Sequence, residues 1–336
     1  MLWLNSLFGS FNSTGSYYFD RLTNSQKNAY TAIVSGIDGF ASEIKLPLMP
    51  VNEISMIVDC VRLDNPLFFY VSSTFNYVKD LSKNKCIVRL DYKYPRSFVR
   101  QTTNTIMTYL RVFDTVKSGS DVDKEIYVHD YCLNNFHYDN SFGDDSHSIL
   151  GPILNKTAVC EGIAKFVKLS LDHLGVKNLV VCGKARNPID NSTLERHAWN
   201  IVFVEGRAYH LDVTFDMTVK GKVNRYDYFN LADEDIKDER TIISNTPACS
   251  TIGNDYMTVN ALVANSPTEL EKMIGTALRS GKKNVLVKLK NIKDTATIAD
   301  KVMVIAQQQY GSIYNRNVTV AINYNPSQWV FEVNFT

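Results

Sequence analysis

Apolar and polar positions follow two different periods along the first third of the chain. Thr23-x-x-Gln26 is a capping box, and the apolar residues after it recur every three to four positions, so we expect a helix there. Other stretches alternate at every second residue, which is typical of strands. The further expected elements are a helix over 52–63, strands over 67–72 and 86–94, and a helix over 97–115. Together they predict an N-terminal α+β domain over residues 1–118.

A second domain is expected after the small and polar segment 117–120, over residues 119–250. One helix starts at Asp121, and a later helix starts at Cys160 and stops before Gly175, which suits the left-handed conformation that ends many helices. The apolar face of the later helix is formed by Ile163, Phe166, Val167, Leu171 and Leu174. A strand over 179–183 and a hairpin of strands 197–204 and 207–213 are expected to follow.

The last part of the chain predicts a small C-terminal α/β domain over residues 256–336. Its expected elements are strands over 257–263, 284–289, 318–323 and 328–334, with helices over 267–280 and 295–310. This region contains no cysteine and no histidine, so we interpret it as a binding or spacing module.

Composition narrows the classes of function. The chain of 336 residues is 45% hydrophobic and 21% charged, with a net charge of +1, which is typical of a globular protein. No basic run is longer than Lys282-Lys283, so we expect no nucleic-acid partner. No apolar stretch approaches the roughly 20 residues that span a bilayer, and the N-terminus lacks a basic leader. The sequence therefore predicts a cytoplasmic protein, with a trimmed form of an exported protein as the alternative.

The six cysteines lie at wide spacings and form no C-x-x-C pair. We therefore expect no metal site and no cofactor, and we interpret most of the thiols as small buried apolar groups. The sequence does not specify an oligomeric state.

Three residues combine types and positions that suit nucleophilic catalysis. Cys160 opens a predicted helix, His197 opens a predicted strand, and Asp212 lies on the next predicted strand. A free cysteine has a pKa near 8.5, and a helix N-terminus beside a cationic imidazole can lower such a value to about 3.5–7.5. We expect Cys160 to attack an acyl carbon, His197 to shuttle the proton and Asp212 to orient the imidazole. Taken singly, each residue would more often be structural; their order, spacing and elements together favour catalysis.

The predicted hairpin brings two of these residues to one face of a sheet. With a turn centred on 205–206, Trp199 faces Asp212, and His197 becomes a diagonal neighbour of Asp212 within hydrogen-bond reach. A shift of one residue would put the two on opposite faces. Asp216 has the same strand parity and is the alternative orienting residue.

Residues beside the trio have expected secondary roles. Trp199 is expected to be a core residue that shields the His–Asp pair from water. Glu161 suits the positive end of the helix dipole, although its charge would oppose a nearby thiolate. The backbone N–H of Cys160 is the first candidate for an oxyanion donor, and the hydroxyl of Tyr138 is another. The other histidines are interpreted as surface or structural residues.

The segment from about 122 to 231 resembles the transglutaminase-like superfamily, whose core is papain-like. The resemblance rests on AVCEGIAKFVKLSLDHLGV, HAWNIVFVEGRAYHLDVTFD and YDYFNLADED, and on the order Cys, His, Asp. It implies Cys160 as nucleophile, His197 as base and Asp212 as the third member. Phe215 stands where this family usually has a tryptophan. The flanking segments are similar to those of bacterial members.

The resemblance implies a thioester intermediate and leaves its acceptor open, because the family contains cross-linking enzymes, peptidases, amidases and inactive relatives. We expect an enzyme that acts on a protein or peptide substrate, at a peptide or glutamine-type amide, with hydrolysis favoured over transamidation. No acidic cluster suggests calcium control. The alternative is a non-catalytic interaction protein that keeps this fold.

Overall fold

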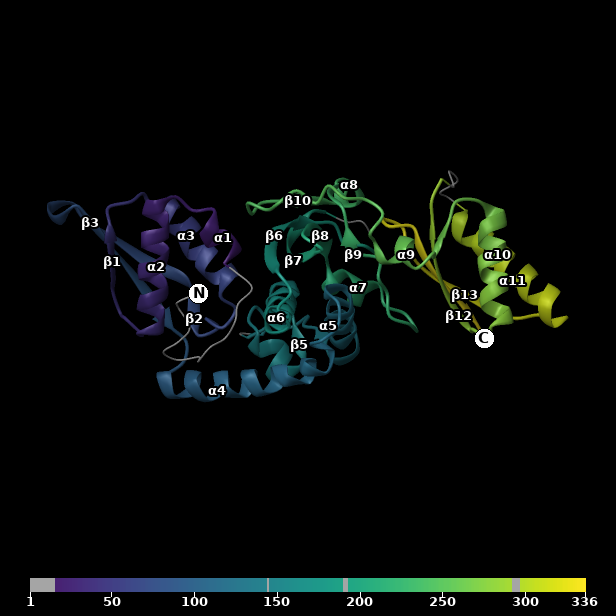
Figure 1. Ribbon diagram of the computed structural model, residues 1–336, viewed down its shortest axis with the longest axis horizontal. Helices are drawn as coiled ribbons and strands as arrows, with labels where there is room; N and C mark the ends of the chain where they lie inside the picture. The colour runs from purple at the N-terminus through teal and green to yellow at the C-terminus, as the bar shows by residue number, and fades with distance from the viewer. Residues whose placement is uncertain (1–15, 144, 190–192, 292–296) are drawn as a thin grey trace. The chain divides into compact units, whose positions relative to one another are not determined.

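The computed structural model describes residues 16–143, 145–189, 193–291 and 297–336 (Figure 1). It confirms the α+β class, since helices accompany several separate sheets. The residues form two compact units. Among the described residues, unit 1 comprises 16–181, 198–206 and 244–246, and unit 2 comprises 182–197, 207–243 and 247–336. The expected division into domains 1–118, 119–250 and 256–336 stays a prediction.

Unit 1 begins with three helices and a small antiparallel sheet. The helices are α1 (Tyr17–Asp20), α2 (Asn24–Asp38) and α3 (Val51–Asp64), and the strands are β1 (Ile44–Pro47), β2 (Val71–Asp80) and β3 (Lys85–Tyr92), in the order β1-β3-β2. Thr23 caps α2 and forms the predicted capping box with Gln26. The strand expected over 67–72 begins only at Val71, because residues before it form turns.

The rest of unit 1 leads to the helix that carries Cys160. Its elements are α4 (Arg96–Tyr109), a 3-10 helix (Leu110–Val116), α5 (Asp121–Asn135), β4 (His137–Tyr138), a π-helical turn (Gly151–Asn155), β5 (Thr157–Ala158) and α6 (Cys160–His173). Ser120 caps α5 and forms a capping box with Asp123. Gly175 has a φ of 79°, so it supplies the left-handed residue that was predicted beyond α6.

Among the described residues, five strands form the largest sheet, in the order β10-β6-β7-β8-β9. They are β6 (Asn178–Ala185), β7 (Glu195–Val204), β8 (Arg207–Leu211), β9 (Phe229–Leu231) and β10 (Arg240–Ile242), with the helices α7 (Val213–Val219) and α8 (Asp233–Ile236) in the same region. The turn between β7 and β8 consists of Glu205 and Gly206, with φ values of 51° and 78°. Two positive φ values are typical of the type I′ turn that joins tight hairpins, and the predicted turn is confirmed.

The C-terminal part of unit 2 is a four-stranded sheet in the order β11-β12-β14-β13. Its strands are β11 (Val263–Ala264), β12 (Asn284–Leu289), β13 (Val320–Asn325) and β14 (Val330–Phe335). The helices α10 (Pro267–Arg279) and α11 (Ile298–Tyr314) pack together and contact this sheet (Figure 1). Their core includes the fully buried residues Ile274, Val287, Val302, Phe331 and Val333.

Two predicted strands are wrong in part. The strand expected over 257–263 is mostly α9 (Tyr256–Val259) and a turn, since Asp255 caps this short helix through the N–H of Thr258. The strand expected over 207–213 ends at Leu211, because the side chain of Asp212 caps α7. None of the described helices is long and apolar enough to cross a membrane.

Candidate active site

Cys160 is the first residue of α6 and is partly exposed. Val159 precedes it in an extended conformation and offers no side-chain cap, so backbone N–H groups of the first turn lack a partner within the helix. The thiol packs against a small cluster formed by Ala164, Val180 and Ala198. Ala198 directly follows His197 in the chain. The thiol is therefore placed at the positive end of a helix and next to β7, which begins at Glu195, two residues before His197.

A buried amide fixes β7 to α6. Asn200, the last residue of the HAWN motif, is 1% exposed. Its Nδ2 donates to the carbonyl of Ala164 at 3.0 Å and to the carbonyl of Leu179 at 3.5 Å. Because Ala164 lies one turn after Cys160, this contact sets the position of the histidine strand along the cysteine helix.

Gly162 allows a backbone segment to lie against the start of α6. A Cβ atom at this position would meet the carbonyl oxygen of Ser146, and would lie 3.0 Å from that of Ser148 and 2.9 Å from the Cβ of Ala158. The carbonyl of Ser146 also accepts the N–H of Val159 at 3.2 Å. The absence of a side chain at Gly162 thus makes room for the segment 146–148.

We predict that Gly162→Ala lowers the free energy of unfolding by about 1–3 kcal/mol, although alanine usually favours a helix, because the backbone of 146–148 has to move. Thermal unfolding measures the change. Gly311→Ala in α11 is the matched control, since its Cβ would meet only the carbonyl of Arg316 at 3.8 Å. That variant should be as stable as the unchanged protein or more so. Equal effects of the two substitutions would contradict the prediction.

Three basic side chains surround the carboxylate of Glu161. Its carboxylate accepts from Lys165 at 2.6 Å, from Nδ1 of His147 at 3.2 Å and from Arg62 at 3.5 Å. Burial acts to raise the pKa of this carboxyl, but His147, Lys165 and Arg62 outweigh burial and hold it well below the ordinary value. Glu161 is therefore ionised. The charges of Lys165 and Arg62 offset the repulsion that this carboxylate would exert on a neighbouring thiolate.

The structure brings His197 and Asp212 together. Nε2 of His197 lies 2.7 Å from Oδ2 of Asp212, and the side chains are 8% and 2% exposed. Oδ1 of Asp212 accepts the backbone N–H of Phe215 at 3.0 Å. Burial acts to raise the pKa of Asp212, but His197, Arg240 and these hydrogen bonds lower it to about 2. An ionised carboxylate only accepts, so we assign the hydrogen to Nε2 of His197, and Nδ1 is the nitrogen suited to accept a proton.

Arg240 and Phe215 complete the surroundings of Asp212. Nη1 of Arg240, 1% exposed, donates to Oδ2 of Asp212 at 2.7 Å. The ring of Phe215 stacks on the imidazole of His197, with centroids 4.3 Å apart, and the guanidinium lies 4.6 Å from the centroid of the same ring. Phe215 therefore holds His197 in place by its ring and Asp212 by its N–H. Sequence reasoning missed Arg240, because no local pattern connects it with a carboxylate 28 residues earlier.

We predict that Arg240→Met raises the pKa of Asp212, because one of the groups that favour its charged form is removed. A carboxyl with a lowered pKa adds stability above its ordinary value near 4, and this stability is lost as the pH falls toward 2. The variant should therefore be less stable at neutral pH by about 1.5–3 kcal/mol, and it should lose less stability than the unchanged protein over that acid range.

Urea denaturation at about pH 7 and at several values between about 4 and 2 checks this result. Arg89→Met is the control, because Arg89 forms an exposed pair with Glu43 at 2.8 Å and should not alter the acid dependence. Parallel curves of stability against pH for the Arg240 variant and the unchanged protein would rule out the coupling.

The other expected site residues occupy different surroundings. Asp216 lies in α7 rather than on a strand, and its Oδ1 accepts the N–H of Tyr228 at 3.1 Å. The strand parity that made it an alternative to Asp212 is therefore wrong. Trp199 is 1% exposed, as a core residue. Tyr138 is 39% exposed on β4, where it pairs with Ala158, two residues before Cys160.

One group outside these residues offers three possible metal ligands. Ligand atoms of His210, Asp233 and Cys249 lie within 4.8 Å of one another. Hydrogen bonds account for the arrangement: Nε2 of His210 lies 2.9 Å from Asp233, whose other oxygen accepts the N–H of Cys249 at 2.8 Å. Burial, helped by the charge of Asp233, raises the pKa of the Cys249 thiol, whereas a metal needs the thiolate. The donors therefore fit a hydrogen-bonded cluster better than a metal site, and the expected absence of a metal stays a prediction.

Comparison with known proteins finds weak similarity to solved structures. No family model and no curated protein matches this chain. A crystal structure named as a candidate cysteine protease from Cytophaga hutchinsonii is 11% identical, with a TM-score of 0.25, over 43% of this chain and 63% of that chain. A crystal structure of a TGase is 15% identical, with a TM-score of 0.29, over 57% of this chain and 55% of that chain.

The matched regions thus span less than two thirds of either solved structure. Their names agree with the superfamily that the sequence motifs resemble. The TM-scores are too low for these structures to carry an argument about the site, which therefore rests on the residues themselves.

Proposed function

We propose that this protein is a cysteine-dependent acyl-transfer enzyme with a transglutaminase-like, papain-like core. Cys160 is the nucleophile, His197 the base and acid, and Asp212 the residue that orients the imidazole. The observation that carries the proposal is the hydrogen bond between Nε2 of His197 and Asp212, because a buried carboxylate at this nitrogen orients the imidazole for proton exchange at Nδ1. The position of Cys160 at the start of α6 supports it.

The proposed reaction has two steps. Sγ of Cys160, having given its proton to Nδ1 of His197, attacks the carbonyl carbon of a peptide or glutamine-type amide. The C–N bond breaks, the leaving amine takes the proton from His197, and a thioester remains on Cys160. Water, which we favour over an amine as acceptor, gives a proton to His197 and attacks the thioester, and the acid product leaves as Cys160 regains a proton.

Each surrounding residue has a role in this scheme. Asp212 supports the imidazolium during both steps, and its low pKa keeps it ionised across the neutral range. The N–H of Cys160 donates to the developing oxyanion, and the hydroxyl of Tyr138 is the candidate for a second donor. Arg240 and Phe215 are positioning residues, because they contact Asp212 and His197.

Thiol alkylation tests the proposal without a known substrate. Iodoacetamide at neutral pH should label Cys160 much faster than the other five cysteines, as measured by mass spectrometry of the digested protein. Simple exposure does not explain such a result if Cys182, which is also partly exposed, reacts slowly. Equal rates at Cys160 and Cys182 would refute an activated nucleophile and favour the non-catalytic alternative.

The acceptor needs a separate experiment. The protein is incubated with a library of glutamine-containing peptides, with and without a tagged primary amine, and with the Cys160→Ala protein as control. We expect release of ammonia or peptide cleavage without the tag entering the products. Tag incorporation that depends on Cys160 would instead establish transamidation.

A further inference from the structure

In the part of the chain that the structure describes, the first half of β12 has no neighbouring strand on the side of β11. The edge strand β11 has only two residues, and it pairs with Lys288 and Leu289 of β12. On its other side β12 pairs with β14 from Asn284 to Lys288. Among the described residues, no strand therefore lies beside the first half of β12 on the β11 side.

The backbone hydrogen bonds of β12 show which of its peptide groups face the side without a neighbouring strand. The carbonyl of Lys283 accepts from β14 at 2.9 Å, and the N–H of Leu289 donates toward β14 at 2.8 Å. The N–H of Lys288, by contrast, donates to Leu262 on the β11 side at 2.7 Å. Because successive residues of a strand alternate, the N–H and C=O groups of Asn284 and Leu286 face the open edge. Both residues are only partly buried.

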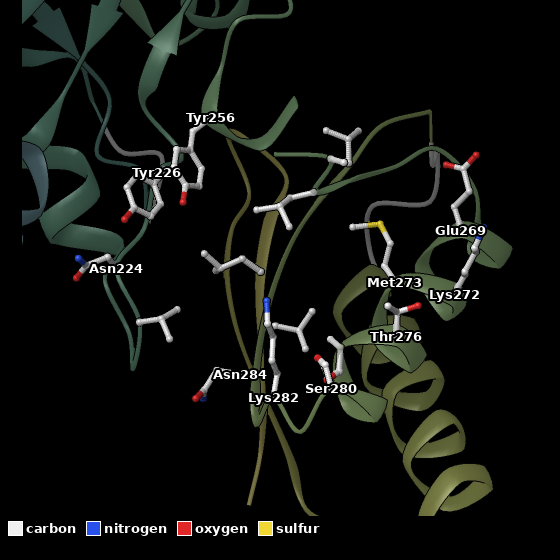
Figure 2. Close-up of a pocket in the computed structure, with 17 residues that line it drawn as sticks. Asn224, Tyr226, Tyr256, Glu269, Lys272, Met273, Thr276, Ser280, Lys282 and Asn284 are labelled. Atoms are coloured by element: carbon white, nitrogen blue, oxygen red, sulfur yellow. Dashed lines mark hydrogen bonds between the residues drawn. The ribbon is translucent and has the colours of Figure 1, made fainter. Parts of the chain in front are cut away.

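A cavity of about 770 Å³ lies at this edge, within unit 2. Figure 2 shows Asn224 and Tyr226 on one side, Met273 and Thr276 of α10 on the other, and Asn284 between them. The rings of Tyr226 and Tyr256 stack with centroids 3.7 Å apart, which stiffens the first wall. The edge of β12 thus has a wall on each face of the sheet, where alternate side chains of an added strand would point.

The charges around the cavity favour an acidic ligand. Lys272 and Lys282 line it, both are exposed, and the described residues provide neither with an ion-pair partner. The lining carboxylate, Glu269, already accepts the backbone N–H and the side-chain amide of Asn265, at 2.7 and 3.1 Å. The hydrogen bonds to Asn265 and the charge of Lys272 lower the pKa of Glu269, so the two lysines face one ionised carboxylate and a net positive charge remains beside the open edge.

We propose that this groove binds an extended acidic peptide, which adds to β12 as a strand opposite Asn284–Leu286 and continues the line of β11. The backbone groups of Asn284 and Leu286 that face the open edge match those of an extended polypeptide, the walls supply contacts for its alternate side chains, and the lysines attract carboxylates. A second folded copy of this chain fits less well, because α10 and the segment 223–226 flank the edge on both faces. Binding is independent of catalysis by Cys160.

Fluorescence polarisation with the Cys160→Ala protein tests this proposal apart from the enzymatic one. The probes are fluorescein-labelled libraries of peptides of about eight residues, in which Glu alternates with Val, Ile or Tyr. Matched libraries carry Lys in place of Glu, or N-methyl groups on alternate amides. We expect the acidic library to bind about tenfold or more tightly than both others, and to slow hydrogen exchange in the peptide that contains Asn284 and Leu286.

Variants locate the bound peptide. Leu286→Pro removes an N–H that faces the open edge and spares the bonds to β14, so binding should fall at least about tenfold. Ile322→Pro is the matched control, because Ile322 likewise faces outward on β13, at the opposite edge of the same sheet. The double variant Lys272→Glu/Lys282→Glu should bind the basic library more tightly than the acidic one. This variant tests the proposal even if the proline variant does not fold.

Several results would overturn the proposal. These are the absence of binding in all three libraries, equal binding of the N-methylated library, or binding that survives both Leu286→Pro and the charge reversal. A dimer in sedimentation experiments that Leu286→Pro dissociates would instead assign the edge to a second copy of the chain.

Discussion

The His197→Ala protein is expected to lose the selective alkylation of Cys160, with a rate about 100-fold lower at a pH near 6. In the proposed site a protonated His197 keeps the thiol as a thiolate at this pH. The substitution removes the imidazolium that stabilises the thiolate, and the thiolate is the form that iodoacetamide alkylates. A thiolate that is stabilised by a nearby charge is intrinsically less nucleophilic than a free one, and this limits the difference between the two alkylation rates. Rates of iodoacetamide labelling between about pH 5 and 9 measure it.

His173→Ala is the control for this experiment. His173 lies in the last turn of the same helix, and its Nε2 contacts Asp114 at 2.7 Å, so its removal should leave the labelling of Cys160 unchanged. Asp212→Asn should give an intermediate rate, because the imidazole remains but its orientation and charge support weaken. If Cys160 reacted equally fast in the His197→Ala and unchanged proteins, the proposed thiolate–imidazolium pair would be wrong.

Replacement of Arg225 by methionine is expected to destabilise unit 2 by about 3–5 kcal/mol. Arg225 is fully buried, and its guanidinium binds both carboxylate oxygens of Asp227 at 2.9 and 2.7 Å. It also donates to the carbonyl of Val330 at 3.0 Å, and so connects the segment before β9 with the C-terminal sheet. The substitution leaves Asp227 buried with Asn325 as its remaining side-chain donor, and removes the cation that lies 3.9 Å from Glu332.

Urea denaturation followed by hydrogen exchange in the β13 and β14 peptides checks this effect, because a protein of two units need not unfold in one step. Lys237→Met is the matched control, since it removes a basic residue whose pair with Glu234 is exposed, and little change is expected. A similar small change in the Arg225 variant would show that the buried network does not hold unit 2 together.

The positions of the main helices and strands could be predicted from local sequence. The capping box at Thr23, the glycine after α6 and the turn at Glu205-Gly206 act through their own backbone neighbours, so short patterns are sufficient to identify them. The strand expected through Asp212 failed for the same local reason. The apolar alternation continued beyond Leu211, but the carboxylate of Asp212 caps the next N–H groups and starts a helix.

Cys160, His197 and Asp212 could be proposed as a set because their motifs fix residue type and order along the chain. The surroundings of these residues could not be predicted. Arg240 reaches Asp212 from β10, and Phe215 stacks on His197 only because α7 follows directly after Asp212. The first contact depends on where a distant segment lies and the second on the path of the chain after Asp212, and no short pattern in this chain encodes either.

The sequence by itself determined the α+β class, the helix that starts at Cys160 and the hairpin that carries His197, because capping, periodicity and turn chemistry are local properties. Tertiary structure alone decided which charges surround each carboxylate and where a strand edge stays open. Arg62 reaches Glu161 and Arg240 reaches Asp212 from distant parts of the chain, and the open half of β12 exists because β11 is only two residues long. Electrostatic balance and strand pairing are properties of the folded arrangement, since each depends on groups that folding brings together.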